Sequence, residues 1–431
     1  MTIADIKRLN HIKYTAFRNY LKSSKSIVSY LFSYLIRVPW HLLHWKKESL
    51  ETNDILVVVP TINNQKSVRT ILEHLPKETC SVWGSDWGDK MPWPKIEALS
   101  LYYLPLFIKL YISSSKEDKK LIRDFFYEFI TTCAIYKIIE KALIKNNQVK
   151  MIVMANDHIL LTRCLVELAE KHNIKSLYVQ HASVTDKFPP LRFAYSFLDG
   201  LESFEKYKLV GNIRGHVFLS GSPRFDAFHN YKVGEKKYQI GIALNELDDE
   251  DLALNLCLYL KEHYSANIIV RPHPGMLIPG NLLFHKEKFV EQGFAISDPR
   301  KDLSYVFLGN IKVMVANESG IHLDAALMGV PSLLYNFAKN DVLDWYSYIK
   351  KGLIKMCDTF EEVKRMLDSG YQLSEDVVRY YAASFKTDMD GKVGEMIAEF
   401  IKKDVFESEE SALSYVNGFM TDQGEYLEYR N

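Results

Sequence analysis

The stretch IKVMVANESGIHLDAALMGVPSLLY, residues 311–335, contains a complete strand–helix–strand unit. It opens with an apolar, β-branched run, passes through a Ser-Gly turn into a helix, and returns through Gly-Val-Pro to a second apolar run. Two strands joined by a helix form the basic unit of a parallel sheet that helices cover on both faces. We therefore predict strands at 311–315 and 331–335 and a helix at 320–328.

The same alternation runs along the chain in two series. The first begins with ILVVV at 55–59, an apolar run typical of a buried parallel strand. A polar stretch at 226–237 lacks periodicity, and we predict an inter-domain linker there. Further strands are predicted at 81–84, 150–155, 176–179, 195–198, 216–219, 238–243 and 267–270. The two series predict an α/β protein of two Rossmann-like domains facing a central cleft, with ligands beyond the carboxyl ends of the strands.

The length of 431 residues fits two domains of about 150–200 residues each. Residues 92–147 are rich in Leu, Tyr, Phe and Ile and are too long for a plain crossover, so we predict a helical insertion there. The predicted division is a basic helical extension (1–48), an N-terminal acceptor domain (49–226), a C-terminal donor-nucleotide domain (227–403) and an acidic tail (404–431).

The charge of the chain is balanced as a whole but not at its ends. Lys plus Arg and Asp plus Glu both number 54, which argues against a nucleic-acid partner. Residues 1–48 hold nine basic side chains against two acidic ones, among many aromatics. This pattern fits two hypotheses equally: a segment in peripheral contact with an anionic membrane, or a helical extension packed on the domain behind it.

The cysteines and the first apolar stretch bear on location. Five scattered cysteines without CxxC spacing support neither a zinc site nor a disulfide framework, as in a reducing cytoplasm. The uncharged run 26–36 is too short to span a bilayer, which takes about 20 residues. We expect a cytoplasmic protein, placed at the inner face of the cytoplasmic membrane if its N-terminal segment binds lipid.

Two strand-end segments in the second half are candidates for binding phosphate. Ser319 and Gly320, preceded by Glu318, open a helix, where backbone N–H groups, a hydroxyl and the helix dipole favour an anion. The alternative is an ordinary serine N-cap. His273 lies between two prolines, including Pro274, in RPHPG, which fixes its backbone outside any helix. Its imidazole and the Arg271 guanidinium suit a phosphate, the alternative being a structural histidine in a tight turn.

In the first half, the candidates are an imidazole and carboxylates at strand ends. His181 follows a strand and can accept a proton from an acceptor hydroxyl. Asp157 and Asp199 also follow strands, although Asp157 suits an N-cap of the helix predicted at 157–172, and Asp199 a turn before glycine. Ser222, in GSPRFD, either approaches the donor or belongs to a hinge. These residues do not distinguish inversion from retention.

Several motifs are missing. No GxxxxGK[ST] is present, and no GxGxxG follows the first strand, so neither a P-loop NTPase nor a nicotinamide or flavin enzyme is supported. Two DxD triplets, Asp249-Glu250-Asp251 and Asp388-Met389-Asp390, lie within predicted helices rather than at strand ends, so neither suggests a metal-bridged pyrophosphate. We expect no cofactor and no metal, and a leaving group stabilised by His, Ser and a helix N-terminus.

The order QHA (180–182), GSPRFD (221–226), RPHPG (271–275) and NESGIHLDAALMGVPS (317–332) resembles bacterial GT-B glycosyltransferases of capsule, lipopolysaccharide and teichoic-acid synthesis. The most similar are CDP-glycerol glycerophosphotransferases and CMP-sugar transferases (sialyl-, polysialyl- and Kdo-). The resemblance implies that His273, Pro274 and Ser319 contact a cytidylate phosphate, and that His181, Asp199 or Asp157 is the acceptor-side base. The chain departs from these families at Ala182, where the first has glycine, and at Leu198, where the sialyltransferases have an acid.

The resemblance implies a metal-independent transferase that moves a sugar, or a glycerol-phosphate-like unit, from a CMP- or CDP-linked donor to a glycan or lipid-linked glycan acceptor. Helices of 92–147 would then shape the acceptor site. Two alternatives remain: a nucleotide-sugar epimerase of the same architecture, which needs an acid/base cluster in the first domain, and a non-catalytic polysaccharide-assembly protein. The sequence does not predict the oligomeric state.

Overall fold

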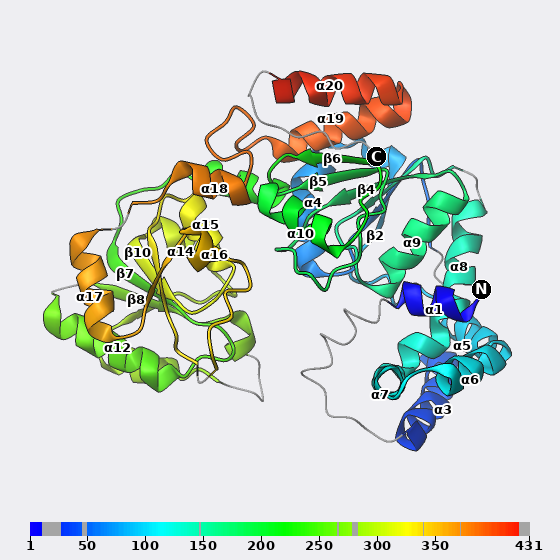
Figure 1. Cartoon of the computed structure of the whole chain (residues 1–431), viewed down its shortest axis with the longest axis horizontal. Helices are drawn as coiled ribbons and strands as arrows, with labels where there is room; N and C mark the ends of the chain where they lie inside the picture. Colours follow the sequence, from blue (N-terminus) through cyan, green and yellow to red (C-terminus); the bar gives the residue numbers. More distant parts are fainter. Residues whose placement is uncertain are drawn as a thin grey trace. The chain divides into compact units, whose positions relative to one another are not determined.

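A computed structural model describes residues 1–10, 27–44, 50–145, 148–264, 267–277, 283–338, 340–370 and 372–421. Two six-stranded parallel sheets organise these residues (Figure 1). The first sheet has the order β2-β1-β3-β4-β5-β6. Its strands are β1 (Ile55–Val58), β2 (Cys80–Trp83), β3 (Met151–Met154), β4 (Lys175–Val179), β5 (Tyr195–Leu198) and β6 (His216–Leu219).

The second sheet has the order β12-β11-β10-β7-β8-β9. Numbered within the sheet this is the order 3-2-1-4-5-6 of dinucleotide-binding folds. Its strands are β7 (Tyr238–Ala243), β8 (Ile268–Arg271), β9 (Ala295–Ile296), β10 (Ile311–Ala316), β11 (Ser332–Tyr335) and β12 (Lys355–Cys357). The predicted strands are therefore found, and the short β9 and β12 are additions.

In both sheets the order in which strands are added reverses at the first strand. The first sheet places β2 on one side of β1 and β3 on the other, and the second places β8 and β10 on opposite sides of β7. The loops after such neighbouring strands part in opposite directions, which leaves room for a ligand beyond the carboxyl ends. In the second sheet these are the loops that follow β7 and β10.

Apolar clusters cover both faces of the second sheet. Ile240 and Ile242 of β7 belong to a cluster with helix α12, whereas Ala243 belongs to a cluster with α14 and α15 on the other face. Strands buried on both faces explain the continuous apolar runs in the sequence. The helices of this part are α11 (Asp226–His229), α12 (Glu250–His263), α13 (Lys286–Glu291), α14 (Ser304–Gly309), α15 (Ile321–Leu327), α16 (Tyr348–Lys351), α17 (Phe360–Ser369) and α18 (Glu375–Tyr381).

The chain divides into two compact units. Residues 1–199, 203–224 and 394–431 form the first, and 200–202 and 225–393 form the second. Helices α19 (Val393–Phe406) and α20 (Glu409–Thr421) therefore join the first unit, which differs from the predicted end of the second domain at 403 and from the predicted tail at 404. The reason is packing: Phe400 makes edge contacts with Tyr195 and Phe197 of the first sheet. Residues 422–431 lie outside the described part.

The predicted insertion consists of four helices between β2 and β3. They are α5 (Trp93–Tyr102), α6 (Leu104–Ser113), α7 (Lys116–Asp124) and α8 (Phe126–Ile144). The N-terminal segment contributes α1 (Ile3–Leu9) and α3 (Ile27–His44), and Ile6 and Tyr34 enter one apolar cluster with α6 to α8. The other helices of the first unit are α4 (Ile62–His74), α9 (Leu160–Lys171) and α10 (Leu201–Val210).

Two local predictions need correction. Helix α9 begins at Leu160 rather than at Asp157, and Asn156 Oδ1, not Asp157, accepts the N–H groups of His158 and Ile159. The predicted linker at 226–237 begins with the short helix α11, whose Asp226 carboxylate accepts the N–H of Val393. Neither side-chain contact follows from local periodicity.

Within the described residues no single helix is long and apolar enough to cross a membrane. The pair α5 and α6 passes that test of length and composition together, with a bend of 61° between them.

Candidate functional site

The second unit places His273 at the carboxyl end of β8. Its side chain is 48% exposed, and Pro274 next to it begins the 3₁₀ turn Pro274–Leu277. The ring Nδ1 accepts the N–H of Gly275 at 3.1 Å, and Glu246 Oε1 lies 3.1 Å from the same nitrogen. In the neutral tautomer that accepts this N–H, the proton is on Nε2, which can donate to an anion. When the ring is protonated, Nδ1 instead donates to Glu246.

Glu246 is a site residue that the sequence did not predict. It lies in the loop after β7, the strand between β8 and β10. Gly275 makes room for it, because a Cβ at that position would lie 1.7 Å from Glu246 Oε1. Asn245 beside it donates from Nδ2 to the carbonyl of Glu318 at 3.5 Å. The loop after β7 therefore contacts both predicted phosphate-binding segments.

Ser319 and Gly320 lie at the carboxyl end of β10. Gly320 is exposed, and apart from its neighbours in the chain no atom lies within 4 Å of the position of a Cβ there. Ser319 Oγ accepts the N–H of Ile321 at a long 3.5 Å, which leaves the hydroxyl free to donate. The Glu318 carboxylate accepts the N–H groups of Leu343 and Trp345, so it positions that loop and is not directed at a donor.

Buried polar groups hold this segment in place. Asn317 Nδ2 donates to Asp248 Oδ1 at 2.7 Å. Burial raises the pKa of Asp248 to about 6, although hydrogen bonds from Asn245 and Asn317 lower it. His322 is fully buried, with Nε2 3.1 Å from the Asn317 carbonyl and Nδ1 3.0 Å from Ser332 Oγ. Because a carbonyl only accepts, Nε2 carries the proton and Nδ1 accepts from serine. Burial lowers the pKa of His322 to about 4, so the ring is neutral.

Arg271 differs from its predicted role. The structure buries it, and its guanidinium donates to Ser297 Oγ at 2.7 Å and to the carbonyl of Asp302 at 2.8 Å. These hydrogen bonds use both terminal nitrogens of the guanidinium group. We therefore assign Arg271 to the packing of its own unit rather than to phosphate binding.

The first unit brings Asp157 and His181 together. Asp157 is buried, accepts the hydroxyl of Tyr207 at 2.7 Å and lies 2.8 Å from His158 Nδ1. The His158 ring lies 5.5 Å from the His181 ring, centroid to centroid. Burial opposes the charge of Asp157, yet the bonds from His158 and Tyr207 hold its pKa below the usual value. His158 was not predicted, although it follows Asp157 directly in the sequence.

His181 is the neutral member of this group. Burial, aided by the nearby His158, lowers its pKa to about 4. Its Nδ1 is enclosed and has no hydrogen-bond partner among the described residues. A neutral imidazole at pH 7 is in the state that a general base requires.

Asp199 and Ser222 are also in this unit but are enclosed. Asp199 is 3% exposed, and its carboxylate lies 3.4 Å from Arg224 Nη2. The neighbouring Gln180 ties the two loops, because its Oε1 accepts the N–H of Asp199 at 2.9 Å. Ser222 is fully buried, so its hydroxyl does not reach solvent, and we remove it from the donor set.

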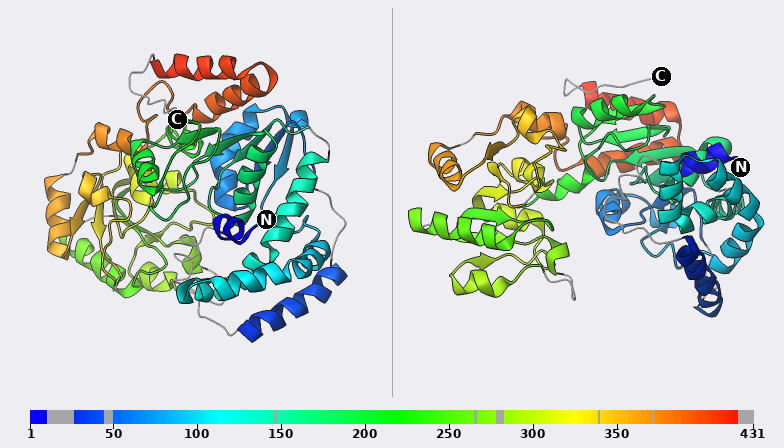
Figure 2. Two further views of the ribbon diagram at one scale, coloured as in Figure 1. Left: turned by 45° about the vertical axis from the view of Figure 1, so that its right-hand side comes forward. Right: turned by 60° about the horizontal axis from the view of Figure 1, so that its bottom comes forward.

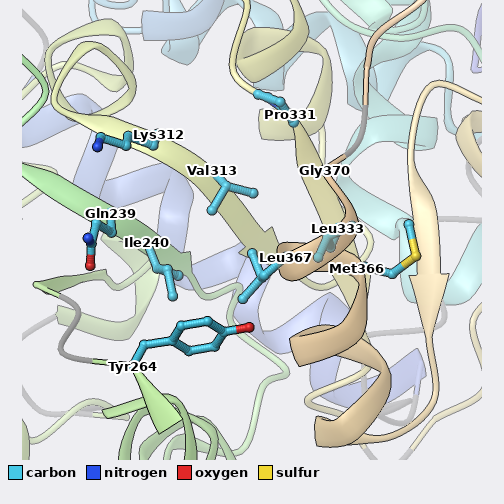
Figure 3. Close-up of a pocket in the computed structure, with 10 residues that line it drawn as sticks. All are labelled: Gln239, Ile240, Tyr264, Lys312, Val313, Pro331, Leu333, Met366, Leu367 and Gly370. Atoms are coloured by element: carbon cyan, nitrogen blue, oxygen red, sulfur yellow. The ribbon is translucent and has the colours of Figure 1, made fainter.

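A separate pocket lies at the opposite ends of the strands of the second sheet. It has a volume of about 430 Å³ and lies near the amino ends of β7, β10 and β11, beside α17 (Figure 3). Ile240, Val313, Leu333, Met366 and Leu367 line it. It is therefore distinct from the loops that carry His273 and Ser319. Over the described ranges, no cluster of three or more His, Cys, Asp or Glu side chains is arranged to hold a metal ion.

No protein-family model matches the chain, and no curated protein matches it. Solved structures do. UDP-GlcNAc 2-epimerase from Neisseria meningitidis bound to UDP-GlcNAc is 13% identical, with 81% of this chain and 99% of that chain covered and a TM-score of 0.50. A second UDP-N-acetylglucosamine 2-epimerase is 12% identical over 82% and 96%, with a TM-score of 0.50. The glycotransferase of kitacinnamycin is 9% identical over 82% and 100%, with a TM-score of 0.49.

At these identities the likeness shows the fold alone. Two six-stranded parallel sheets with flanking helices, matched over almost the whole of both epimerase chains, confirm the predicted two-domain, Rossmann-like GT-B fold. The narrower resemblance to cytidylate-using transferases stays a prediction.

Proposed function

We propose that this protein is a glycosyltransferase that moves a sugar, or a glycerol-phosphate-like unit, from a CMP- or CDP-linked donor to a hydroxyl of a surface glycan. The observation that carries the proposal is the exposed imidazole of His273 and the open Ser319-Gly320 turn, at the ends of the two strands that flank β7. Donors fixed at these points stabilise charge that develops on a leaving phosphate, because they need no reorganisation during the reaction.

In the proposed reaction, the acceptor oxygen attacks the transferred carbon or phosphorus atom while the bond to the nucleotide phosphate breaks. The nucleotide leaves with the bonding electrons, and His273 Nε2–H and the Ser319 hydroxyl donate to its phosphate. His181 takes the acceptor proton, since its neutral imidazole can accept one. Asp157 has an indirect role: its carboxylate lies 2.8 Å from His158 Nδ1 and orients that ring, which lies beside the His181 ring.

A thermal-shift panel of CMP, CDP, UDP and GDP tests the donor side. A nucleotide at 100 times its Kd stabilises the protein by about 2.7 kcal/mol, and we expect the cytidine nucleotides to give the largest shifts. UDP is the main competitor, because one matching structure is bound to UDP-GlcNAc. A shift with UDP and none with CMP or CDP would refute the cytidine assignment and leave the phosphate site standing.

His273→Ala tests the role of the imidazole. We expect turnover to fall by about 2–4 kcal/mol of transition-state stabilisation, because a fixed donor to the leaving phosphate is lost. His263→Ala is the matched control: this histidine is exposed, and it contacts the carbonyl and the ring of Tyr259 in its own helix. Near-wild-type turnover of His273→Ala would exclude it from the mechanism.

The cluster of Asp157, His158 and His181 also favours a second candidate, an epimerase acting on the nucleotide sugar itself. Such an enzyme needs acid/base groups in the first unit. Incubation of the enzyme with CMP- and UDP-sugars in the absence of acceptor separates the two: epimerised or hydrolysed sugar supports the epimerase. Failure of every nucleotide to shift the melting temperature would instead favour a non-catalytic assembly protein.

A further inference from the structure

Helix α3 has one packed face and one bare face. On the packed face, the hydroxyl of Tyr34 donates to the carbonyl of Glu97 at 3.2 Å, and His41 Nδ1 lies 2.5 Å from the Glu97 carboxylate. The His41 ring also stacks on Trp93 of α5, with centroids 5.5 Å apart. These contacts fix the rotation of α3 and therefore which side chains point outward.

The outward face of α3 is apolar. At 3.6 residues per turn its side chains fall on the side of the helix opposite Tyr34 and His41. Their exposed fractions lie between 53% and 81%. They are Val28, Phe32, Leu35, Ile36, Trp40 and Leu43. Between Ile27 and His44, Arg37 is the single Lys, Arg, Asp or Glu residue. A helix on the surface of a globular domain normally shows the reverse arrangement.

The neighbouring insertion helices also carry exposed apolar side chains. Leu101 and Tyr102 at the end of α5 are 52% and 76% exposed, and Ile108 and Ile112 of α6 are 48% and 68% exposed. In both views of Figure 2 the dark-blue helix α3 lies at the edge of the cyan insertion helices. We call the six outward residues of α3 the apolar face.

The N-terminal sequence that contains α3 is basic. Residues 1–48 hold nine basic side chains against two acidic ones, with Lys22 and Lys25 before α3 in the sequence and Lys46 and Lys47 after it. Lys95, Lys109 and Lys116 of α5 to α7 are exposed. A soluble protein partner explains the apolar side chains but not this excess of basic residues, whereas a bilayer with anionic head groups complements both.

We propose that the apolar face binds the surface of an anionic lipid bilayer, with α3 lying in the plane of the head groups. The proposal rests on the proposed function in one respect: it would bring the enzyme to a lipid-linked acceptor. Trp40, 57% exposed, then sits at the boundary between acyl chains and water.

Vesicle co-sedimentation of the full chain tests the proposal. We expect binding to vesicles of phosphatidylglycerol and phosphatidylcholine, weaker binding at high salt, and little binding to phosphatidylcholine alone. Phe32→Ser with Leu35→Ser removes two side chains that are 64% and 63% exposed, and should weaken binding by at least about tenfold. The matched control is Leu209→Ser with Val290→Ser, 83% and 55% exposed, which should bind as the wild type does.

Three outcomes would overturn the proposal. The first is a wild-type chain that stays in the supernatant with both kinds of vesicle, and the second is a Phe32/Leu35 variant that still sediments fully. The third is a concentration-dependent dimer, seen by analytical ultracentrifugation, that the same variant abolishes while vesicles bind neither protein; this would assign the face to a second copy. The nucleotide panel is run on the same variants, so a failure of the bilayer proposal and a failure of the donor site remain distinguishable.

Discussion

At the scale of single residues, burial separates the three histidines of the two candidate sites. Burial lowers the pKa of both His181 and His322 to about 4, whereas His273 remains half-exposed at its loop. A low pKa keeps a ring neutral, but its surroundings decide its use. Both ring nitrogens of His322 form hydrogen bonds within the fold. Nδ1 of His181 has no hydrogen-bond partner among the described residues.

His181→Ala should lower kcat by about 10²–10⁴-fold, because a positioned base contributes about that much. Since the pKa of His181 is about 4, the wild-type rate should not fall through its protonation until the pH approaches that value. The pH profile of kcat/KM on a soluble acceptor checks both statements. An acid limb near pH 6.5, or a variant within twofold of wild type, would assign the base elsewhere.

His322 should make stability depend on pH. The unfolded chain takes up this proton near pH 6.5 and the folded chain near pH 4, so the contribution is complete above 6.5 and is lost as the pH falls toward 4. We expect a loss of up to about 3 kcal/mol over this window relative to His322→Gln. Urea unfolding of both proteins at pH 7 and pH 4.5 measures it. Asp248, with its raised pKa, has the opposite slope but is common to both proteins.

At the scale of elements, α19 shows how a distant segment becomes part of a sheet domain. Its Asp404 side chain is 1% exposed, lies 2.8 Å from Lys175 Nζ and accepts the hydroxyl of Tyr195 at 2.7 Å. Both partners belong to strands more than 200 positions earlier in the chain. These bonds and the Phe400 contacts hold the helix against the first sheet.

Asp404→Ala should lower the free energy of unfolding by about 2 kcal/mol, because it removes the acceptor of the buried Tyr195 hydroxyl. It also leaves the Lys175 ammonium with Glu409, 3.3 Å away, as its remaining partner. Lys402→Ala is the control, since its pair with Glu399 is partly exposed, at 35% and 33%, and should contribute less than about 1 kcal/mol. Urea unfolding followed by circular dichroism measures both. Equal values for the two variants would contradict the anchoring role of Asp404.

At the scale of the whole molecule, the two units contain separate apolar clusters. Phe129 belongs to the cluster that joins α1, α3 and the insertion, and Leu256 to one of the clusters of the second unit. Helices α1 and α3 are therefore not a detachable anchor, because Ile6 and Tyr34 enter the former cluster. Removing the segment would expose that cluster, so point substitutions on the outward face of α3 are the cleaner test of lipid binding.

Each of the two units should have its own unfolding transition. Phe129→Ala and Leu256→Ala should each cost about 2–5 kcal/mol, as large-to-small changes in a core do. Because His273 and Ser319 belong to the second unit, a bound nucleotide should raise the transition that Leu256→Ala lowers. Scanning calorimetry with and without CMP measures this. A nucleotide that raised only the transition lowered by Phe129→Ala would place its site in the first unit.

The sequence by itself determined ten of the twelve described strands, their parallel arrangement and the two strand-end segments at His273 and Ser319. These follow from local apolar periodicity and from turn residues, which are properties of neighbours in the chain. It did not predict Glu246, the neutral state of His322, the pairing of His158 with Asp157, or the return of α19 to the first sheet. Those depend on contacts and burial between segments far apart in the chain. Only the tertiary structure decides which polar groups lose water and which partners replace it. For this reason it showed that Arg271 and Ser222, predicted to bind the donor, are buried in the interior.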